Sequence, residues 1–83
     1  MFFGWKLISE VRKLITRIYE EVFENEDEQT ASELIVELLN KTNYDLDKIL
    51  ELAGKTLGME RYVWFYTYLM NWIIHYLGSV VAN

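Results

Sequence analysis

The sequence predicts an all-α protein, a small four-helix bundle with a central aromatic-rich C-terminal helix. Apolar residues recur every three or four positions along most of the chain, which is the spacing of a helix that buries one side. The chain contains no proline, so nothing interrupts long helices, and its 52% hydrophobic content suits a folded core. Its 83 residues are too few for two cores, so we expect a single helical domain over residues 1–83.

The first helix is expected over residues 4–24, because its apolar residues alternate at spacings of three and four. This stripe consists of Ile8, Val11, Ile15, Ile18 and Val22. Basic residues lie toward the start of the helix and acidic residues at its end, which opposes the helix dipole, so packing against other helices must stabilise it. Residues 24–29 then contain no apolar side chain and are predicted to form a solvated connection.

The second helix is predicted to begin at Thr30, where residues 30–33 have the pattern of a capping box. In such a box the Thr30 hydroxyl accepts a hydrogen bond from the backbone N–H of Glu33, and the Glu33 side chain returns to the backbone N–H of Thr30. Residues 34–39 supply the apolar face of the helix, and the turn-forming residues 40–43 end it.

The third helix is expected between Asp45 and Gly58. The Asp45 carboxylate can accept from the free N–H groups at the start of the helix, and Gly58 can adopt the left-handed conformation that ends one. Gly54 lies inside this helix and costs about 1 kcal/mol relative to alanine. We therefore expect Gly54 to mark a close crossing with another helix.

The fourth helix is expected over residues 60–81 and is apolar around nearly its whole circumference. Its exception is a narrow polar stripe, formed at every fourth position by Thr67, Asn71, His75 and Ser79. No residue after Arg61 carries a formal charge, apart from a proton on His75. Three other helices, each with one apolar stripe, can nearly surround such a helix, so we expect it to form the core.

A membrane span is the alternative for this segment, since residues 62–82 are long enough to cross a bilayer. Aromatic residues run through its middle instead of gathering at its ends, the polar stripe interrupts it, and no basic anchor follows it. These features favour a soluble bundle over a membrane-associated protein anchored by this helix. The first residues have no basic region ahead of an apolar stretch, so a cytoplasmic location is expected.

The large rings of the fourth helix predict self-association, because a small domain rarely hides so many of them and small chains often complete their cores by oligomerising. We expect a homodimer whose interface consists of Tyr62, Trp64, Phe65, Tyr68, Trp72 and Tyr76. The alternative is that all the large rings of this helix pack inside one monomeric bundle.

The charges favour a protein partner over a nucleic acid. Thirteen acidic residues against eight basic ones give a net charge of −5, whereas nucleic-acid binding depends on neutralising phosphate charge. Residues 30–58 could suggest a helix-turn-helix DNA reader, but they include no arginine, the side chain that most often reads guanine. A dense acidic segment is either a solvated face or a docking patch for a basic partner: Glu20, Glu21, Glu24, Glu26, Asp27 and Glu28.

Enzymatic chemistry is not expected. The chain has no cysteine, and its serines stand outside any Gly-x-Ser-x-Gly motif, with a single histidine to serve them. That residue, His75, has no carboxylate within reach along its helix, so neither a metal site nor a cofactor is predicted. We expect His75 to be a hydrogen-bonded core or interface residue, with Asn71 as its nearest partner. The sequence thus favours a non-enzymatic interaction protein that binds its partner through a hydrophobic or acidic surface.

A further alternative comes from residues 33–58, which contain the run Leu-Asn-Lys-Thr-Asn-Tyr-Asp-Leu-Asp-Lys-Ile-Leu-Glu-Leu-Ala-Gly. This stretch covers about a third of the chain and loosely resembles the helical part of heme nitric oxide/oxygen binding domains. The resemblance implies a heme or ligand carrier with His75 as the proximal ligand. The family's Tyr-x-Ser-x-Arg propionate clamp is absent, as is most of the domain that encloses the heme, so the resemblance does not identify the family.

Overall fold

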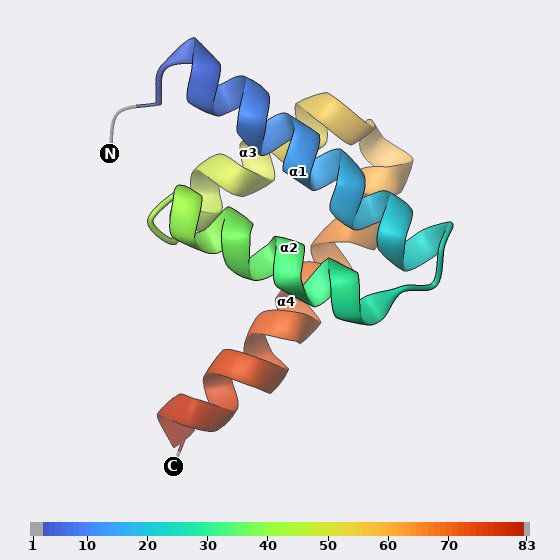
Figure 1. Ribbon diagram of the computed structural model, residues 1–83, viewed down its shortest axis with the longest axis vertical. Helices are drawn as coiled ribbons and strands as arrows, with labels where there is room; N and C mark the ends of the chain where they lie inside the picture. Colours follow the sequence, from blue (N-terminus) through green and yellow to red (C-terminus); the bar gives the residue numbers. More distant parts are fainter. Residues whose placement is uncertain (1–2, 83) are drawn as a thin grey trace.

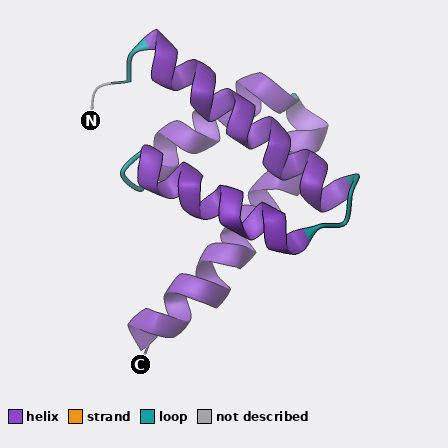
Figure 2. Ribbon diagram, in the orientation of Figure 1, coloured by secondary structure: helices purple, strands orange, loops and turns teal. Residues whose placement is uncertain are grey.

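Four α-helices make up the protein, in the order that the sequence predicts (Figure 1). The computed structural model describes residues 3–82, with side chains through residue 78. Over that range it consists of α1 (Trp5–Phe23), α2 (Glu28–Lys41), α3 (Leu46–Leu57) and α4 (Met59–Ala82), joined by short connections and without a strand (Figure 2). The predicted all-α four-helix bundle is confirmed.

The core is built mainly from the first three helices. α1 and α2 lie side by side and antiparallel, and α3 packs against α1 (Figure 1). Each helix turns its apolar stripe inward, as the spacing of three and four predicts. The buried residues are Val11, Leu14, Ile15 and Ile18 of α1, Ala31, Leu34, Ile35, Leu38 and Leu39 of α2, and Ile49, Leu52, Ala53 and Leu57 of α3.

α2 begins at Glu28, earlier than predicted, and Asp27 caps it in place of Thr30. The Asp27 carboxylate accepts a hydrogen bond from the Thr30 backbone N–H at 3.1 Å and another from the Thr30 hydroxyl at 2.6 Å. A carboxylate in this position interacts favourably with the helix dipole as well as with both donors, so it replaces the hydroxyl as the cap. Both bonds lower the pKa of Asp27 below its usual value, and the bond from the Thr30 hydroxyl has the larger effect.

The predicted boundary residues of α3 are confirmed. The Asp45 carboxylate accepts from the Lys48 backbone N–H at 3.2 Å, and Gly58 ends the helix with φ 84° and ψ 163°. These angles are reached almost only by glycine, and Gly58 alone separates α3 from α4. The prediction of a close helix crossing at Gly54 is wrong. That position is exposed, and the nearest atom that an added Cβ would meet is Tyr62 Cδ1 at 3.9 Å.

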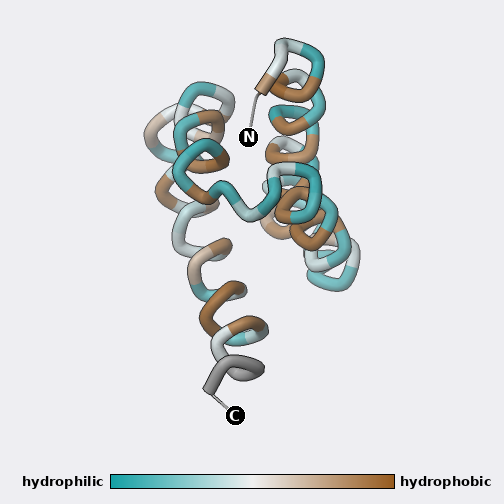
Figure 3. Tube along the Cα trace, turned by 90° about the vertical axis from the view of Figure 1, so that its left-hand side faces the viewer, coloured by the Kyte–Doolittle hydropathy of each residue, from teal (hydrophilic) through white to brown (hydrophobic). Residues whose placement is uncertain are grey.

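α4 packs on the other helices with one face, which differs from the central position expected for it. Phe65, Leu69 and Trp72 enter the core, whereas much of the rest of the helix stays exposed. Since α1 already packs against both α2 and α3, too little apolar surface is left on the three helices to surround a fourth. The C-terminal part of α4 extends past the other three helices (Figure 1, Figure 3). Among the described residues, none of the helices combines the length and the hydropathy that a membrane span requires.

Candidate functional site

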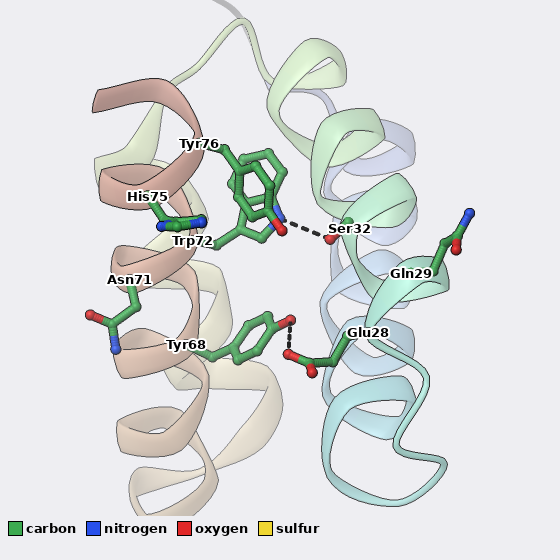
Figure 4. A pocket seen from close by; sticks show the side chains of 8 residues that line it. All are labelled: Glu28, Gln29, Ser32, Tyr68, Asn71, Trp72, His75 and Tyr76. Atoms are coloured by element: carbon green, nitrogen blue, oxygen red, sulfur yellow. Dashed lines mark hydrogen bonds between the residues drawn. The ribbon is translucent and has the colours of Figure 1, made fainter. Parts of the chain in front are cut away.

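Three aromatic residues of α4 face the start of α2 across a cleft (Figure 4). Tyr68, Trp72 and Tyr76 recur at every fourth position, so the geometry of a helix places them one above the other on one side. The Trp72 and Tyr76 rings stack with centroids 5.0 Å apart and a tilt of 37°. The indole of Trp72 is almost fully buried, whereas Tyr76 stays half exposed and lines the cleft.

Two hydrogen bonds join these rings to the first turns of α2 (Figure 4). The Tyr68 hydroxyl donates to Glu28 Oε1 at 3.2 Å, and the Trp72 indole Nε1–H donates to Ser32 Oγ at 3.0 Å. Glu28 and Ser32 are four residues apart and therefore share a face of α2. The two helices are thus linked by matching pairs of residues, one turn apart.

The cleft between these helices has a volume of about 540 Å³. Gln29 of α2 and Asn71 and His75 of α4 complete its lining, and the side chains of Gln29 and Asn71 point away from its centre (Figure 4). His75 meets the Tyr76 ring edge-on, with centroids 4.9 Å apart. With His75 neutral, Glu28 supplies the only formal charge in the lining, so the site combines aromatic rings with one carboxylate.

The electrostatics of the cleft keep Tyr68 protonated. Partial burial is the first cause that raises the pKa of Tyr68, and the neighbouring Glu28 carboxylate is the second; together they raise it to about 12. Both causes disfavour a phenolate, because its charge would lose water contact and lie beside another negative charge. The Tyr68 hydroxyl therefore remains a hydrogen-bond donor to Glu28 through the physiological pH range.

His75 lies on the surface instead of in a core, and the expected hydrogen bond to Asn71 is not formed within the described part of the chain. The imidazole contacts Tyr76, whereas the Asn71 side chain points outward (Figure 4). Residues 3–78 contain no group of three or more histidine, aspartate and glutamate side chains arranged to hold a metal ion. An exposed imidazole of this kind lacks the apolar enclosure that a heme requires.

The acidic segment is exposed apart from the partly buried Glu21, and some of its residues already make contacts that stabilise the fold. Glu21 accepts a hydrogen bond from the Asn25 side chain, Asp27 caps α2, and Glu28 accepts from Tyr68. The remaining candidates Glu20, Glu24 and Glu26 point into solvent at the end of α1 and in the following loop. The structure therefore divides the predicted docking patch into acids that shape the α1–α2 connection and acids available to a partner.

The rings predicted to form a dimer interface do not share one surface. Phe65 and Trp72 are buried in the chain's own core, which is a correction to the expectation, and Tyr62 and Tyr68 are half-buried beside them. Trp64 and Tyr76 are exposed, as is Tyr66, which was not assigned to the interface. The Phe23 ring of α1 meets the Trp64 ring edge-on, with the ring centroids 6.2 Å apart. Tyr68, Trp72 and Tyr76 instead contribute to the cleft.

A second apolar surface of α4 was missed from the sequence. It lies on a different side from the buried rings, and we call it the outer row: Met59, Val63, Tyr66, Met70, Ile73 and Leu77. Its first three members are exposed and the others are half-buried, with the exposed Ile74 beside them. The spacings along the row alternate between four and three, which is the signal that could have identified it. The large rings at other positions of this nearly all-apolar helix hid that pattern.

Comparisons with known proteins place the chain in no family. No family model matches it, and no curated protein and no solved structure has significant similarity to it. The heme-domain resemblance of residues 33–58 thus gains no support from them. The function has to be inferred from the surfaces of the molecule itself.

Proposed function

We propose that this protein is a non-enzymatic interaction module that forms a homodimer through the outer row of α4. The observation that carries the proposal is an apolar helix face that the core covers only in part: Met70, Ile73 and Leu77 pack partly against it, whereas the rest of the row stays exposed. Met59 is 80% exposed and Ile74 is 69% exposed, and Val63 and Tyr66 lie between them. Contiguous apolar surface on a small domain is typical of an interface.

The spacing of the outer row suits a helix of the same kind. Apolar residues at alternating intervals of four and three form the seam of a coiled coil, in which side chains of each helix fit between those of the other. Met59, Val63, Tyr66 and Met70 follow this spacing over three turns, and Ile73 and Leu77 continue it. A second α4 offers the identical seam, so a symmetric pair can bury both rows at once.

The distribution of charge also favours a second copy. The side chains of the outer row carry no formal charge, and Glu60 and Arg61, which follow Met59, have opposite charges, so two copies of this surface have little net charge to repel each other. The acidic end of α1 lies on the other side of α4, where Phe23 contacts Trp64 and Tyr68. In such a dimer the acids of residues 20–28 stay in solvent, and Glu20, Glu24 and Glu26 remain available to a basic partner protein.

Sedimentation equilibrium at micromolar concentration tests the proposal. We expect a species of twice the 10.0 kDa chain mass. Val63→Glu and Ile74→Glu each place a charge in or beside the seam and should produce monomers, because burying an unpaired charge is costly. Val36→Glu is the matched control, since Val36 is a similarly exposed valine on α2, and it should leave the dimer intact.

Two results would contradict the homodimer. One is a wild-type chain that stays at the monomer mass; the other is a set of seam variants that dimerise as well as Val36→Glu. A monomer that sediments with phosphatidylcholine vesicles, and loses that property on Val63→Glu, would instead support the membrane-associated alternative for α4.

A further inference from the structure

We infer that the cleft between α2 and α4 binds an organic ammonium group, held by the Glu28 carboxylate and by the rings of Tyr68 and Tyr76. The ammonium group can belong to a small molecule or to a lysine side chain, because both present the same charge and the same alkyl surface. The site is separate from the outer row, so this inference does not depend on the homodimer.

The hydrogen bonds of the cleft select a cation. Two donors in the lining, the Tyr68 hydroxyl and the Trp72 indole N–H, already donate to Glu28 and Ser32, and the amides of Gln29 and Asn71 point away from the centre (Figure 4). What faces a ligand is therefore the Glu28 carboxylate and aromatic rings, with the Tyr76 hydroxyl and the His75 imidazole as the remaining donors. The Glu28 carboxylate has capacity for further donors beyond the bond from Tyr68, since two ionised oxygens offer about four acceptor positions. An anion would meet like charge here and find few donors.

The aromatic rings supply the second attraction. A cation within about 6 Å of a ring centroid is attracted to the negative face of the ring, and the gain is larger where water is partly excluded. Tyr68 and Tyr76 lie two turns apart on α4 with Trp72 between them, so their rings bound the cleft at its two ends (Figure 4). Trp72 is held by Ser32 and by its stack on Tyr76, so little ordering is needed on binding.

The surroundings raise the local concentration of cations. Glu24, Glu26 and Asp27 precede Glu28 directly and carry no compensating base among residues 20–28. The positive end of the α2 dipole opposes this effect, but the Asp27 carboxylate caps it and takes up the Thr30 N–H. The acids beside Glu28 thus favour cations over anions at this end of α2.

Choline and its uncharged carbon analogue 3,3-dimethylbutan-1-ol form the decisive pair of probes, because they share shape and differ in charge. Titration of the ¹⁵N-labelled protein should move the Trp72 indole N–H signal with choline, with a dissociation constant on the order of 1 mM. The uncharged analogue should bind at least about tenfold more weakly. Equal binding of the two probes, or no saturable shift with choline, would overturn the inference.

Matched variants assign the binding to the cleft. Glu28→Gln should weaken choline binding by about tenfold, because it removes the charge and keeps the shape. Glu33→Gln makes the same change on exposed α2 surface outside the cleft and should leave the affinity unchanged. Tyr76→Leu should weaken binding by several fold, whereas Tyr44→Leu, at an exposed position outside both the cleft and the outer row, should not. Choline affinity that is the same in Glu28→Gln and Glu33→Gln would place the binding elsewhere and refute the site.

A third arm separates the two sources of the ammonium group. Butylammonium chloride models a free amine, and the peptide acetyl-Gly-Lys-Gly-amide presents the same group on a chain. Tighter binding of the peptide, lost in Glu28→Gln, identifies a lysine-bearing partner; equal affinity identifies a small-molecule site. Both outcomes support the cleft as an ammonium site, and failure of both probes to bind contradicts it. Repeating the titration on Val63→Glu keeps this result independent of dimerisation.

Discussion

Trp72 and Tyr68 each join α4 to α2 through a partly or fully buried ring and one hydrogen bond. The Trp72 indole is 8% exposed and donates to Ser32, so its removal leaves both a cavity and an unpaired hydroxyl. Trp64 lies two turns earlier on the same helix but is 56% exposed. Residues of one type on one helix therefore have different roles, which only their surroundings decide.

Replacing Trp72 by alanine should lower the free energy of unfolding by about 3 to 5 kcal/mol. The same change at Trp64 should cost less than about 1 kcal/mol, because an exposed ring leaves no cavity behind. Urea denaturation followed by circular dichroism measures both. Similar losses for the two variants would mean that Trp72 is not a core residue. The Trp64 variant must be compared at a concentration where its association state matches that of the wild type.

Tyr68 should make the fold sensitive to alkali. Its pKa is about 12 in the folded chain against 10.0 for a free tyrosine, so the fold favours the protonated form. That contribution to stability is complete below pH 10 and is lost as the pH rises from about 10 to 12. Tyr68→Phe should be less stable at pH 7 by about 1 kcal/mol, because it lacks the bond to Glu28.

The free energy of unfolding of Tyr68→Phe should also fall less steeply between pH 9 and pH 11.5 than that of the wild type. Urea titrations at a series of pH values give both slopes. The other tyrosines are common to the two proteins and cancel in the difference. Identical slopes would show that Tyr68 titrates normally in the fold.

At the scale of the helices, the ends follow from single residues. Asp27 and Asp45 cap α2 and α3 through their carboxylates, and Gly58 allows the abrupt change of direction into α4. Gly54 has no comparable role, because its backbone is helical. A Cβ added there would only come into ordinary van der Waals contact with Tyr62. The two glycines of this region should therefore respond in opposite ways to the same substitution.

Gly54→Ala should raise the free energy of unfolding by about 0.5 to 1 kcal/mol, since alanine reduces the entropy of the unfolded chain and finds room in the helix. Gly58→Ala should lower it by about 1 kcal/mol or more, because a Cβ at φ 84° and ψ 163° is strained. Chemical denaturation of both variants measures the difference. Destabilisation by Gly54→Ala would restore the close helix crossing that the sequence suggested.

For the whole molecule, α1 packs against both α2 and α3, and α4 is covered mainly on one side. The result is a chain whose charges and apolar surfaces are separated, with the acids at the α1–α2 end and the outer row on α4. The ion pairs among the described residues, Lys41–Glu10 and Lys48–Glu51, are partly exposed and contribute little to stability. Association of such a molecule should depend on apolar burial more than on charge.

The proposed dimer should persist when the sodium chloride concentration is raised to about 1 M, because salt screens charges and does not weaken apolar burial. Sedimentation equilibrium over a salt series measures this, with the Val63→Glu monomer as the mass reference. Dissociation at high salt would mean that charge pairing holds the copies together, such as the basic side of α1 against the acids of residues 20–28.

The local features of this protein could be predicted from the sequence. The stripe of α1, the Asp45 cap and the Gly58 stop each depend on residues within one or two turns, and each was found in the expected place. The cap of α2 was assigned to Thr30 instead of Asp27, because both residues can accept from free N–H groups and only the geometry of the connection decides between them.

The position of α4 and the site beside it were decided by the tertiary structure. The sequence by itself determines that Tyr68, Trp72 and Tyr76 share one side of a helix and that the outer row shares another. Both sides are apolar enough to be buried, so the spacing of the apolar residues does not show which of the two sides faces the core. The choice depends on how much apolar surface α1, α2 and α3 have left after covering one another, which is a property of all four helices packed together. Only one side of α4 could be fully buried, and the cleft and the incompletely covered outer row both result from that competition.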